Sequence, residues 1–211
     1  MKGNPRILSE IEQRTCCRNF NPKKRVNPKS VRLILEAGQM APSAKNRQPY
    51  FFITIFNREC RKEIFETAQK GRRKQFAHLS QEEFERTSNG KTGSNDKSMV
   101  DASLAILVMR SSNPKYKEAP EQSKNLNIKE EQGVAAAIYS MQLQARHLGL
   151  DTGWICSPLY LTEELKPIFK KYGIEWQENW EPRVIIPVGY ALESPIKPQR
   201  RTLEDVNKYI Y

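Results

Sequence analysis

The sequence predicts an α+β fold in which helices pack against a sheet of about four strands. Apolar residues recur at helical spacing in 28–41 and again in 130–148. Residues 50–56 and 100–110 are apolar runs of the length of a strand. A chain of 211 residues can bury a core of its own, so we expect one domain, or a compact core with an insertion.

The chain is expected to begin with two helices and a strand. An Asn-Pro pair, which is an N-cap followed by a first-turn proline, opens each of two expected helices at 4–17 and 28–41. Pro42 ends the second of these helices. Residues 50–56 are rich in β-branched and aromatic side chains, so a buried strand is expected there.

The middle of the chain alternates between charged and apolar segments. Residues 58–87 have the pattern of a heavily charged helix, and 88–98 contains two glycines and two asparagines, which indicates a loop. An apolar strand is expected at 100–110. Residues 111–129 are polar and contain proline, so we expect a mobile excursion that could act as a lid.

The last third of the chain should contain two helices and two strands. Residues 130–148 show the strongest helical pattern, and 162–172 should form a second helix. Short strands are expected at 151–156 and 184–188. Pro187 cannot donate a backbone hydrogen bond, which suggests that the last strand lies at an edge or bends.

The charge of the chain suggests one alternative function. Lys and Arg number 35 against 24 Asp and Glu, which gives a formal net charge of +11. Such an excess is typical of nucleic-acid-binding proteins. The sequence nevertheless lacks an interleaved aromatic pattern, a helix-turn-helix and an RNP-like segment, so nucleic acid is not the partner that we expect.

Several kinds of site are not expected. Four cysteines and two histidines show neither a C-x-x-C pair nor workable spacing for a metal, so we expect no disulfide framework and no metal site. The glycines form no dinucleotide fingerprint, phosphate-binding P-loop or nucleophile elbow. No apolar run is long enough to span a bilayer or to form a secretory signal, so a cytoplasmic protein is expected.

Five short segments together carry a family resemblance. They are RTCCRNF at 14–20, APSAKNRQPY at 41–50, NDKSMVDAS at 95–103, LGLDTGWI at 148–155 and RRTLE at 200–204. In this order and spacing the set resembles the nitroreductase family of FMN-dependent oxidoreductases. The resemblance implies an α/β/α sandwich with a central, mostly antiparallel sheet, formed by a single domain over 1–211. It also implies a homodimer with FMN at the subunit interface and a carboxyl-terminal tail, 194–211, that reaches the partner subunit.

The resemblance assigns the phosphate end of FMN to two arginines. Arg14 and Arg200 fall on the family's phosphate positions, and Thr15 would add a hydroxyl donor. Cys16 stands where the family usually has serine, so a weaker thiol replaces a hydroxyl. Arg18 falls on the basic position beside the pyrimidine side of the flavin ring, where a cation would raise the reduction potential.

The remaining cofactor contacts implied by the resemblance come from three further segments. The partner subunit would cover the flavin with a segment from 42 to 46, and Asn95 would face the imide edge of the ring. A third segment would pass beside the reactive N5. The expected residues are Pro42, Ser43, Ala44, Asn46, Asn95, Trp154, Ile155, Cys156 and Ser157. Pro198 takes the place of a phosphate-binding lysine found in some relatives.

The function implied by the resemblance is ping-pong electron transfer. NAD(P)H as co-substrate would reduce FMN at N5, and a nitroaromatic, quinone or related small-molecule acceptor would then occupy the same place. This chemistry needs no side-chain nucleophile, so no catalytic side chain is expected. One alternative is the basic nucleic-acid-binding protein, and another is a flavoprotein of the same fold with different chemistry, such as reductive dehalogenation or flavin-dependent ring fragmentation.

Overall fold

A central antiparallel sheet organises the molecule. The computed structural model describes residues 6–75, 79–80, 82–83, 94–112 and 123–210, with side chains described except at 71–75, 94–96, 123–124 and 158–159. The sheet has four strands in the order β1-β2-β4-β3. These strands are β1 (Tyr50–Ile55), β2 (Leu104–Ser111), β3 (Asp151–Thr152) and β4 (Trp180–Gly189). Every pairing among them is antiparallel, which confirms the expected α+β fold.

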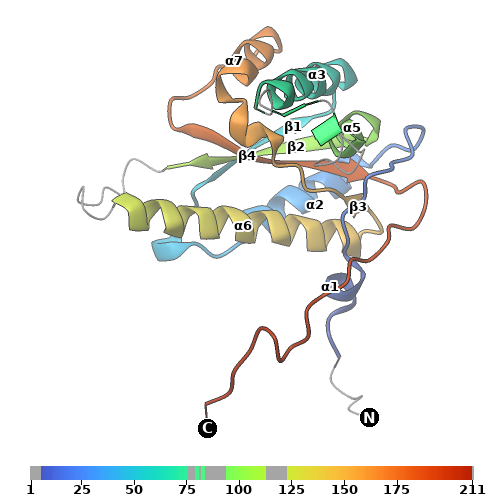
Figure 1. Ribbon diagram of the computed structural model, residues 1–211, viewed down its shortest axis with the longest axis vertical. Coiled ribbons are helices and arrows are strands. Elements are labelled where there is room, and N and C mark those ends of the chain that lie inside the picture. Colours follow the sequence, from blue (N-terminus) through green and yellow to red (C-terminus); the bar gives the residue numbers. More distant parts are fainter. Residues whose placement is uncertain (1–5, 76–78, 81, 84–93, 113–122, 211) are drawn as a thin grey trace.

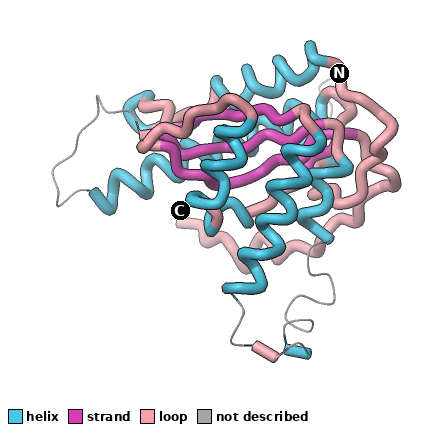
Figure 2. Tube along the Cα trace, turned by 90° about the horizontal axis from the view of Figure 1, so that it is seen from above, coloured by secondary structure: helices cyan, strands magenta, loops and turns pink. Residues whose placement is uncertain are grey.

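Helices cover both faces of this sheet (Figures 1 and 2). One face packs against α2 (Pro28–Gln39) and α6 (Ser123–His147). The other packs against α3 (Arg58–Gln75), α5 (Ser94–Asp101) and α7 (Thr162–Lys171). The result is the expected three-layer arrangement. Two short 3₁₀ turns, η1 (Ala44–Asn46) and η3 (Ser157–Tyr160), and the short helix α1 (Ser9–Gln13) lie outside the layers.

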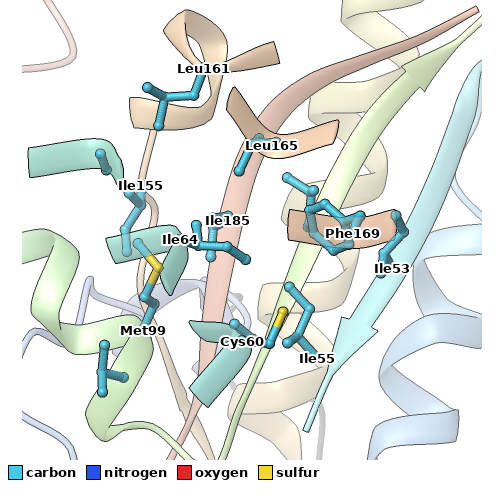
Figure 3. Packing of buried hydrophobic residues seen from close by; sticks show 14 of the residues in the cluster. Ile53, Ile55, Cys60, Ile64, Met99, Ile155, Leu161, Leu165, Phe169 and Ile185 are labelled. Carbon is cyan, nitrogen blue, oxygen red and sulfur yellow. The ribbon is translucent and has the colours of Figure 1, made fainter. Parts of the chain in front are cut away.

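The hydrophobic core is divided in two by β2. Ile106 and Val108 belong to the cluster on the α6 side, whereas Leu107 and Met109 belong to the cluster on the α3 side. Side chains of a strand point alternately to opposite faces, so a strand covered on both faces becomes apolar throughout. Figure 3 shows the second cluster, in which Phe169 of α7 packs with residues of α3 and the strands.

Helix α2 begins as its sequence predicts. The Asn27 side chain accepts a hydrogen bond from the Lys29 backbone N–H at 2.9 Å, and Pro28 follows as the first helical residue. The helix ends at Gln39, before Pro42. Near this end a Cβ on Gly38 would lie 2.8 Å from Met141 Cγ, so the glycine allows α2 to approach α6 closely.

Two predicted boundaries in the first half are wrong. The helix expected at 4–17 is only Ser9–Gln13, and none of its residues is buried. The loop expected at 88–98 falls partly outside the described residues, but its last part is helical because α5 begins at Ser94. The apolar residues Met99, Val100 and Ala102 therefore belong to the end of α5 and the turn after it, and β2 begins at Leu104. A short apolar run does not distinguish a buried helix end from a strand.

The excursion expected at 111–129 is shorter than predicted. Residues 113–122 lie outside the described part of the chain, but α6 begins at Ser123. The first turns of α6 lack an apolar face and are instead tied to the sheet by polar contacts. Arg110 of β2 donates to Asn127 Oδ1 at 2.8 Å and also pairs with Glu181 of β4. Hydrophobic periodicity cannot detect a helix that begins in this way.

The strands near the carboxyl end also differ from the prediction. The strand expected at 151–156 is reduced to Asp151–Thr152, followed by one isolated bridge between Ile155 and Ile185. The strand expected at 184–188 extends over Trp180–Gly189. Of the two possibilities that Pro187 suggested, an edge or a bend, the edge position is wrong, because β3 pairs with this strand on its outer side.

Candidate functional site

Two ends of the chain enclose a pocket of about 670 Å³. One wall is the segment 14–19, which follows α1, and the other is the carboxyl-terminal tail from 193 to 200. Figure 1 shows the two segments leaving the sheet beside each other. The lining consists of Arg14, Thr15, Cys16, Cys17, Arg18, Asn19, Glu193, Ser194, Pro195, Ile196, Pro198 and Arg200.

Backbone hydrogen bonds hold these two walls on the edge of the sheet. The Cys17 N–H donates to the Thr152 carbonyl oxygen at 2.8 Å, next to the outer strand β3. The Leu192 N–H donates to the Asn19 carbonyl oxygen at 2.9 Å, and the Asn19 side chain donates to Glu193 at 3.1 Å. The pocket is therefore built on the sheet, although residues almost two hundred positions apart line it.

The pocket is positively charged. Its lining contains three arginines, Arg14, Arg18 and Arg200, against one carboxylate, Glu193. Arg18 and Arg200 are exposed, whereas Arg14 is half-buried with its Cζ 5.9 Å from the centre of the Tyr139 ring. The Arg14 Nε is buried and has no hydrogen-bond partner among the described residues. Planar guanidinium donors with unused capacity are suited to a phosphate or carboxylate.

The two adjacent cysteines differ in environment. Cys16 is exposed and lines the pocket. Cys17 is buried, and burial is the main cause that raises the pKa of its thiol to about 11. Its Sγ contacts the Asn19 carbonyl oxygen at 3.3 Å, so it is a packed thiol rather than a reactive one. Thr15 donates to the Ile196 carbonyl oxygen at 3.5 Å, a long contact that links the two walls.

The segment 153–157 lies beside the first wall. A Cβ on Gly153 would lie 3.1 Å from the Cys17 carbonyl oxygen and 2.7 Å from Pro187 Cγ, so only glycine fits between them. Ile155 exchanges two backbone hydrogen bonds with Ile185, at 3.1 and 2.9 Å. In such a pair the neighbouring residues present their N–H groups away from the partner strand. The N–H groups of Trp154 and Cys156 therefore face the outer side of the sheet.

Some side chains of this segment are exposed to solvent. The Trp154 side chain is 40% exposed, and its indole N–H donates to Cys156 Sγ at 3.1 Å. Ile155 is buried in the core cluster, whereas Cys156 is exposed. The Ser157 Oγ is buried without a hydrogen-bond partner among the described residues.

Neither the segment 154–157 nor the remaining predicted residues line the pocket within one chain. None of Pro42, Ser43, Ala44 and Asn46 lines it. A Cβ on Gly133 of α6 would lie 3.1 Å from Ser43 Cβ, so this loop packs near the middle of α6, more than one turn before Tyr139. Asn95 lies on α5, but its side chain falls outside the described residues.

The loop before β1 has an unusual backbone. Lys45, Asn46 and Gln48 have φ values of 55°, 52° and 52°, in the left-handed region that lysine and glutamine rarely adopt. Two hydrogen bonds stabilise this shape, since Gln48 N–H donates to Ser43 Oγ and Asn46 N–H to Ser43 O, both at 2.9 Å. Such a backbone persists only where its surroundings stabilise it.

Some residues that connect the two walls of the pocket were not predicted from the sequence. Asn19 and Glu193 connect the walls, and Ile196 contributes the carbonyl group that Thr15 contacts. Asn19 lay within the RTCCRNF segment, where its position in the motif could have marked it. The residues 193–196 form no motif or periodic pattern, and only the fold brings them to this place.

Metal binding and membrane crossing have no support in the described residues. Within the described ranges, no group of three or more His, Cys, Asp or Glu side chains could hold a metal ion. Among the helices of the same ranges, none combines the length and apolar character that a bilayer crossing requires.

Comparison with known proteins identifies the family. The model of the nitroreductase family matches residues 11–190. A stretch of 61 residues is 28% identical to a Staphylococcus epidermidis protein provisionally named as an NAD(P)H nitroreductase, and covers 29% of this chain and only 28% of that relative.

Solved structures share the fold at low sequence identity. A BluB-like flavoprotein from Clostridium difficile 630 has a TM-score of 0.82 at 21% identity, over 96% of this chain and 97% of that one. A nitroreductase with bound FMN from Bacteroides fragilis has a TM-score of 0.70 at 20% identity, with the same coverage of both chains. Because the family model matches from the middle of α1 to the residue after β4, the chain belongs to the nitroreductase family.

Proposed function

We propose that the protein is an FMN-dependent oxidoreductase that uses NAD(P)H to reduce a nitroaromatic, quinone or related small molecule. The observation that carries this proposal is the pocket in which Arg14, Arg18 and Arg200 converge from opposite ends of the chain. When bound, FMN supplies the redox chemistry, by which electrons of a nicotinamide donor reach an acceptor. The protein binds the cofactor, orients it and surrounds it with charge.

The donors of the pocket fit the phosphate of FMN. A phosphate monoester carries nearly two negative charges and accepts several hydrogen bonds. Arg14 has a buried Nε with no hydrogen-bond partner in the described part of the chain, and Arg200 approaches from the opposite wall. Cys16 and Thr15 add weaker donors at the same place. Arg18 adds a third cation, which would stabilise negative charge on a reduced flavin ring.

The segment 154–157 is proposed to pass beside the reactive edge of the flavin. Its support is the outward direction of the Trp154 and Cys156 N–H groups, which follows from the Ile155–Ile185 pair. The exposed Trp154 ring and the buried Ser157 hydroxyl lie on the same segment. No side chain is required to act as a nucleophile, so we propose no catalytic residue.

A homodimer is proposed to complete the site. The loop from Pro42 to Asn46 does not line the pocket of its own chain, so a second copy would have to supply it. Large apolar side chains are also exposed in and just before α1 and from Leu192 along the tail, and a second copy would cover them. They are Ile7, Leu8, Ile11, Leu192, Ile196, Leu203, Val206 and Ile210.

The proposal is tested on the purified protein. We expect a yellow protein whose flavin spectrum belongs to FMN after heat release, and a particle of twice the 24.5 kDa chain mass in light scattering. Turnover of NADH and NADPH against a panel of nitroaromatics and quinones would identify the donor and the acceptor class. A colourless monomer that binds nucleic acid in a salt-sensitive manner would contradict the proposal.

A further inference from the structure

Helix α6 buries one amide side chain under the outer edge of the sheet. Gln142 is only 1% exposed, although its neighbours on the buried face, Ile138, Met141 and Ala145, are apolar. Its Nε2 donates to the Gly153 carbonyl oxygen at 3.2 Å. A buried amide is unfavourable unless it is hydrogen-bonded, so this contact accounts for a polar residue at a core position.

The Gly153 carbonyl needs this donor because its natural partner is missing. The register that pairs Asp151 with Gly189 and Ile155 with Ile185 places Gly153 opposite Pro187. In an antiparallel ladder such a pair exchanges two hydrogen bonds. The Gly153 N–H donates to the Pro187 carbonyl oxygen at 3.1 Å, but proline has no N–H to return. Gln142 therefore takes the place of a donor that the strand cannot supply.

The same contact sets the direction of the next N–H group. The Gly153 carbonyl and the Trp154 N–H belong to one peptide unit, and no cis peptide bond is present among the described residues. In a planar trans peptide these two groups point in opposite directions. A donor that holds the carbonyl towards α6 and β4 thus directs the Trp154 N–H outwards, to the side proposed for the flavin.

We infer that Gln142 is a positioning residue, which compensates for the proline opposite Gly153 and orients the Trp154 N–H towards the reactive edge of the flavin. This inference rests on the proposed function. The peptide is held on a further side by the first wall of the pocket, because Gly153 approaches the Cys17 carbonyl group closely. Gln142 thereby links α6 to both the phosphate end and the ring end of the proposed cofactor site.

The test removes the Gln142 amide and then supplies the Gly153 carbonyl with a backbone donor from β4. Gln142→Met keeps the side-chain volume without the N–H donor, and Gln144→Met is the matched control. Residue 144 is on the same helix but is rotated by about 200° from 142. In the double variant Gln142→Met/Pro187→Val, the valine N–H can donate to the Gly153 carbonyl as in an ordinary ladder.

Hydrogen exchange gives a readout that is independent of activity. In Gln142→Met we expect exchange of the peptide covering 152–156 to accelerate about tenfold in protein without FMN, with little change in Gln144→Met. In the FMN-loaded protein, the rate of flavin reduction by NADH or NADPH should fall about tenfold, with KM for the donor changed less than twofold. The double variant should recover both properties.

Unchanged behaviour of the variants would overturn the inference. A Gln142→Met holoenzyme with unchanged exchange and an unchanged reduction rate would overturn it. If Gln142→Met does not fold, the double variant is measured instead. A double variant that folds and is active supports the inference, and one that folds no better than Gln142→Met overturns it. A wild-type protein that binds no FMN would instead contradict the proposed function, while exchange in the unloaded protein would still test the contact between Gln142 and Gly153.

Discussion

The Arg14 guanidinium lies over the ring of Tyr139, with its Cζ 5.9 Å from the ring centre. Tyr139 belongs to α6, and Arg14 follows the short helix α1, so the contact connects the arginine that we propose to bind phosphate to the longest helix among the described residues. A cation over an aromatic face is stabilised by roughly 0.5–1 kcal/mol at an exposed site. The ring therefore helps to hold Arg14 in the pocket.

Replacement of this ring should weaken cofactor binding modestly. We expect Tyr139→Leu to raise the Kd for FMN by about two- to fivefold, because Arg14 loses the aromatic face that orients it. Tyr139→Phe is the control, since it keeps the ring and should bind FMN as the wild type does. Fluorescence titration of the protein without cofactor measures both values. A Kd for Tyr139→Leu equal to that of Tyr139→Phe would show that the contact is irrelevant to binding.

The buried Arg61 should be a determinant of stability rather than of binding. It is 1% exposed and donates to the carbonyl oxygens of Ile55, Phe56, Val100, Ala102 and Ser103, at the ends of β1 and α5. Burial is the main cause that lowers the pKa of this guanidinium to about 10. The side chain thus supplies hydrogen bonds to carbonyl groups that end two elements in the core.

Arg61→Met should lower the free energy of unfolding by about 3–5 kcal/mol, because several buried carbonyl groups lose their donor. Urea denaturation monitored by circular dichroism provides the measurement. Arg58→Met is the matched control, since Arg58 is exposed on the same helix and should change stability by less than about 0.5 kcal/mol. Equal losses in the two variants would contradict the role assigned to the buried contacts.

A methyl group at Gly153 should disturb both walls of the site. The Cβ of alanine would lie 2.7 Å from Pro187 Cγ and 3.1 Å from the Cys17 carbonyl oxygen, and neither neighbour can rotate away. We expect Gly153→Ala to cost about 1–3 kcal/mol of unfolding free energy. Gly38→Ala should cost less, because the Met141 side chain that it meets can change rotamer and alanine favours the helix. Thermal unfolding of both variants would rank them, and the reverse order would count against the account of Gly153.

The attachment of α1 should depend on pH in the acid range. His147 Nδ1 lies 2.9 Å from Glu10 Oε1, and this hydrogen bond is the main cause that lowers the pKa of Glu10 to about 2. A carboxyl group with a lowered pKa stabilises the folded state above its unfolded value near 4.5, and the contribution is lost as pH falls towards about 2.

Glu10→Gln should therefore have a lower free energy of unfolding than the wild type above about pH 4.5, and this difference should disappear as the pH falls towards about 2. Denaturant titrations at pH 6 and pH 2.5 would measure this difference, and added salt should reduce it at pH 6. Glu12→Gln, on the same helix, controls for the change in net charge. A difference that persists unchanged at pH 2.5 would contradict the role of this pair.

Elements with local signals were predictable from the sequence, and elements defined by distant contacts were not. Asn27 and Pro28 begin α2 as expected because capping is a local interaction. The start of α6 was missed because its first turns are held by Arg110 of β2 rather than by an apolar face. Pro187 suggested an edge or a bend, and the edge position is wrong because the sequence does not reveal that β3 pairs outside this strand or that Gln142 supplies the missing donor.

In the candidate site, too, residues with a local sequence signal were predictable, and residues placed by distant contacts were not. Arg14 and Arg200 were expected to act together from the family resemblance, and the fold brings both to one pocket. The contribution of Glu193 and Ile196 depends on the path of the tail, which no periodic pattern predicts. The left-handed backbone at Lys45 and Gln48 was not predictable, since neither residue type favours it.

Calorimetric titration of the cofactor-free protein with FMN measures whether the arginine pocket holds the cofactor. We expect one FMN per chain, and a Kd raised by about 150-fold or more in Arg14→Ala/Arg200→Ala, because each arginine contributes about 1.5–3 kcal/mol of charge-assisted hydrogen bonding. Arg32→Ala is the control, since Arg32 pairs with Glu36 on α2 and should leave the Kd unchanged. A wild-type protein that binds no FMN, or a double variant that binds it as tightly as the wild type, would contradict the account.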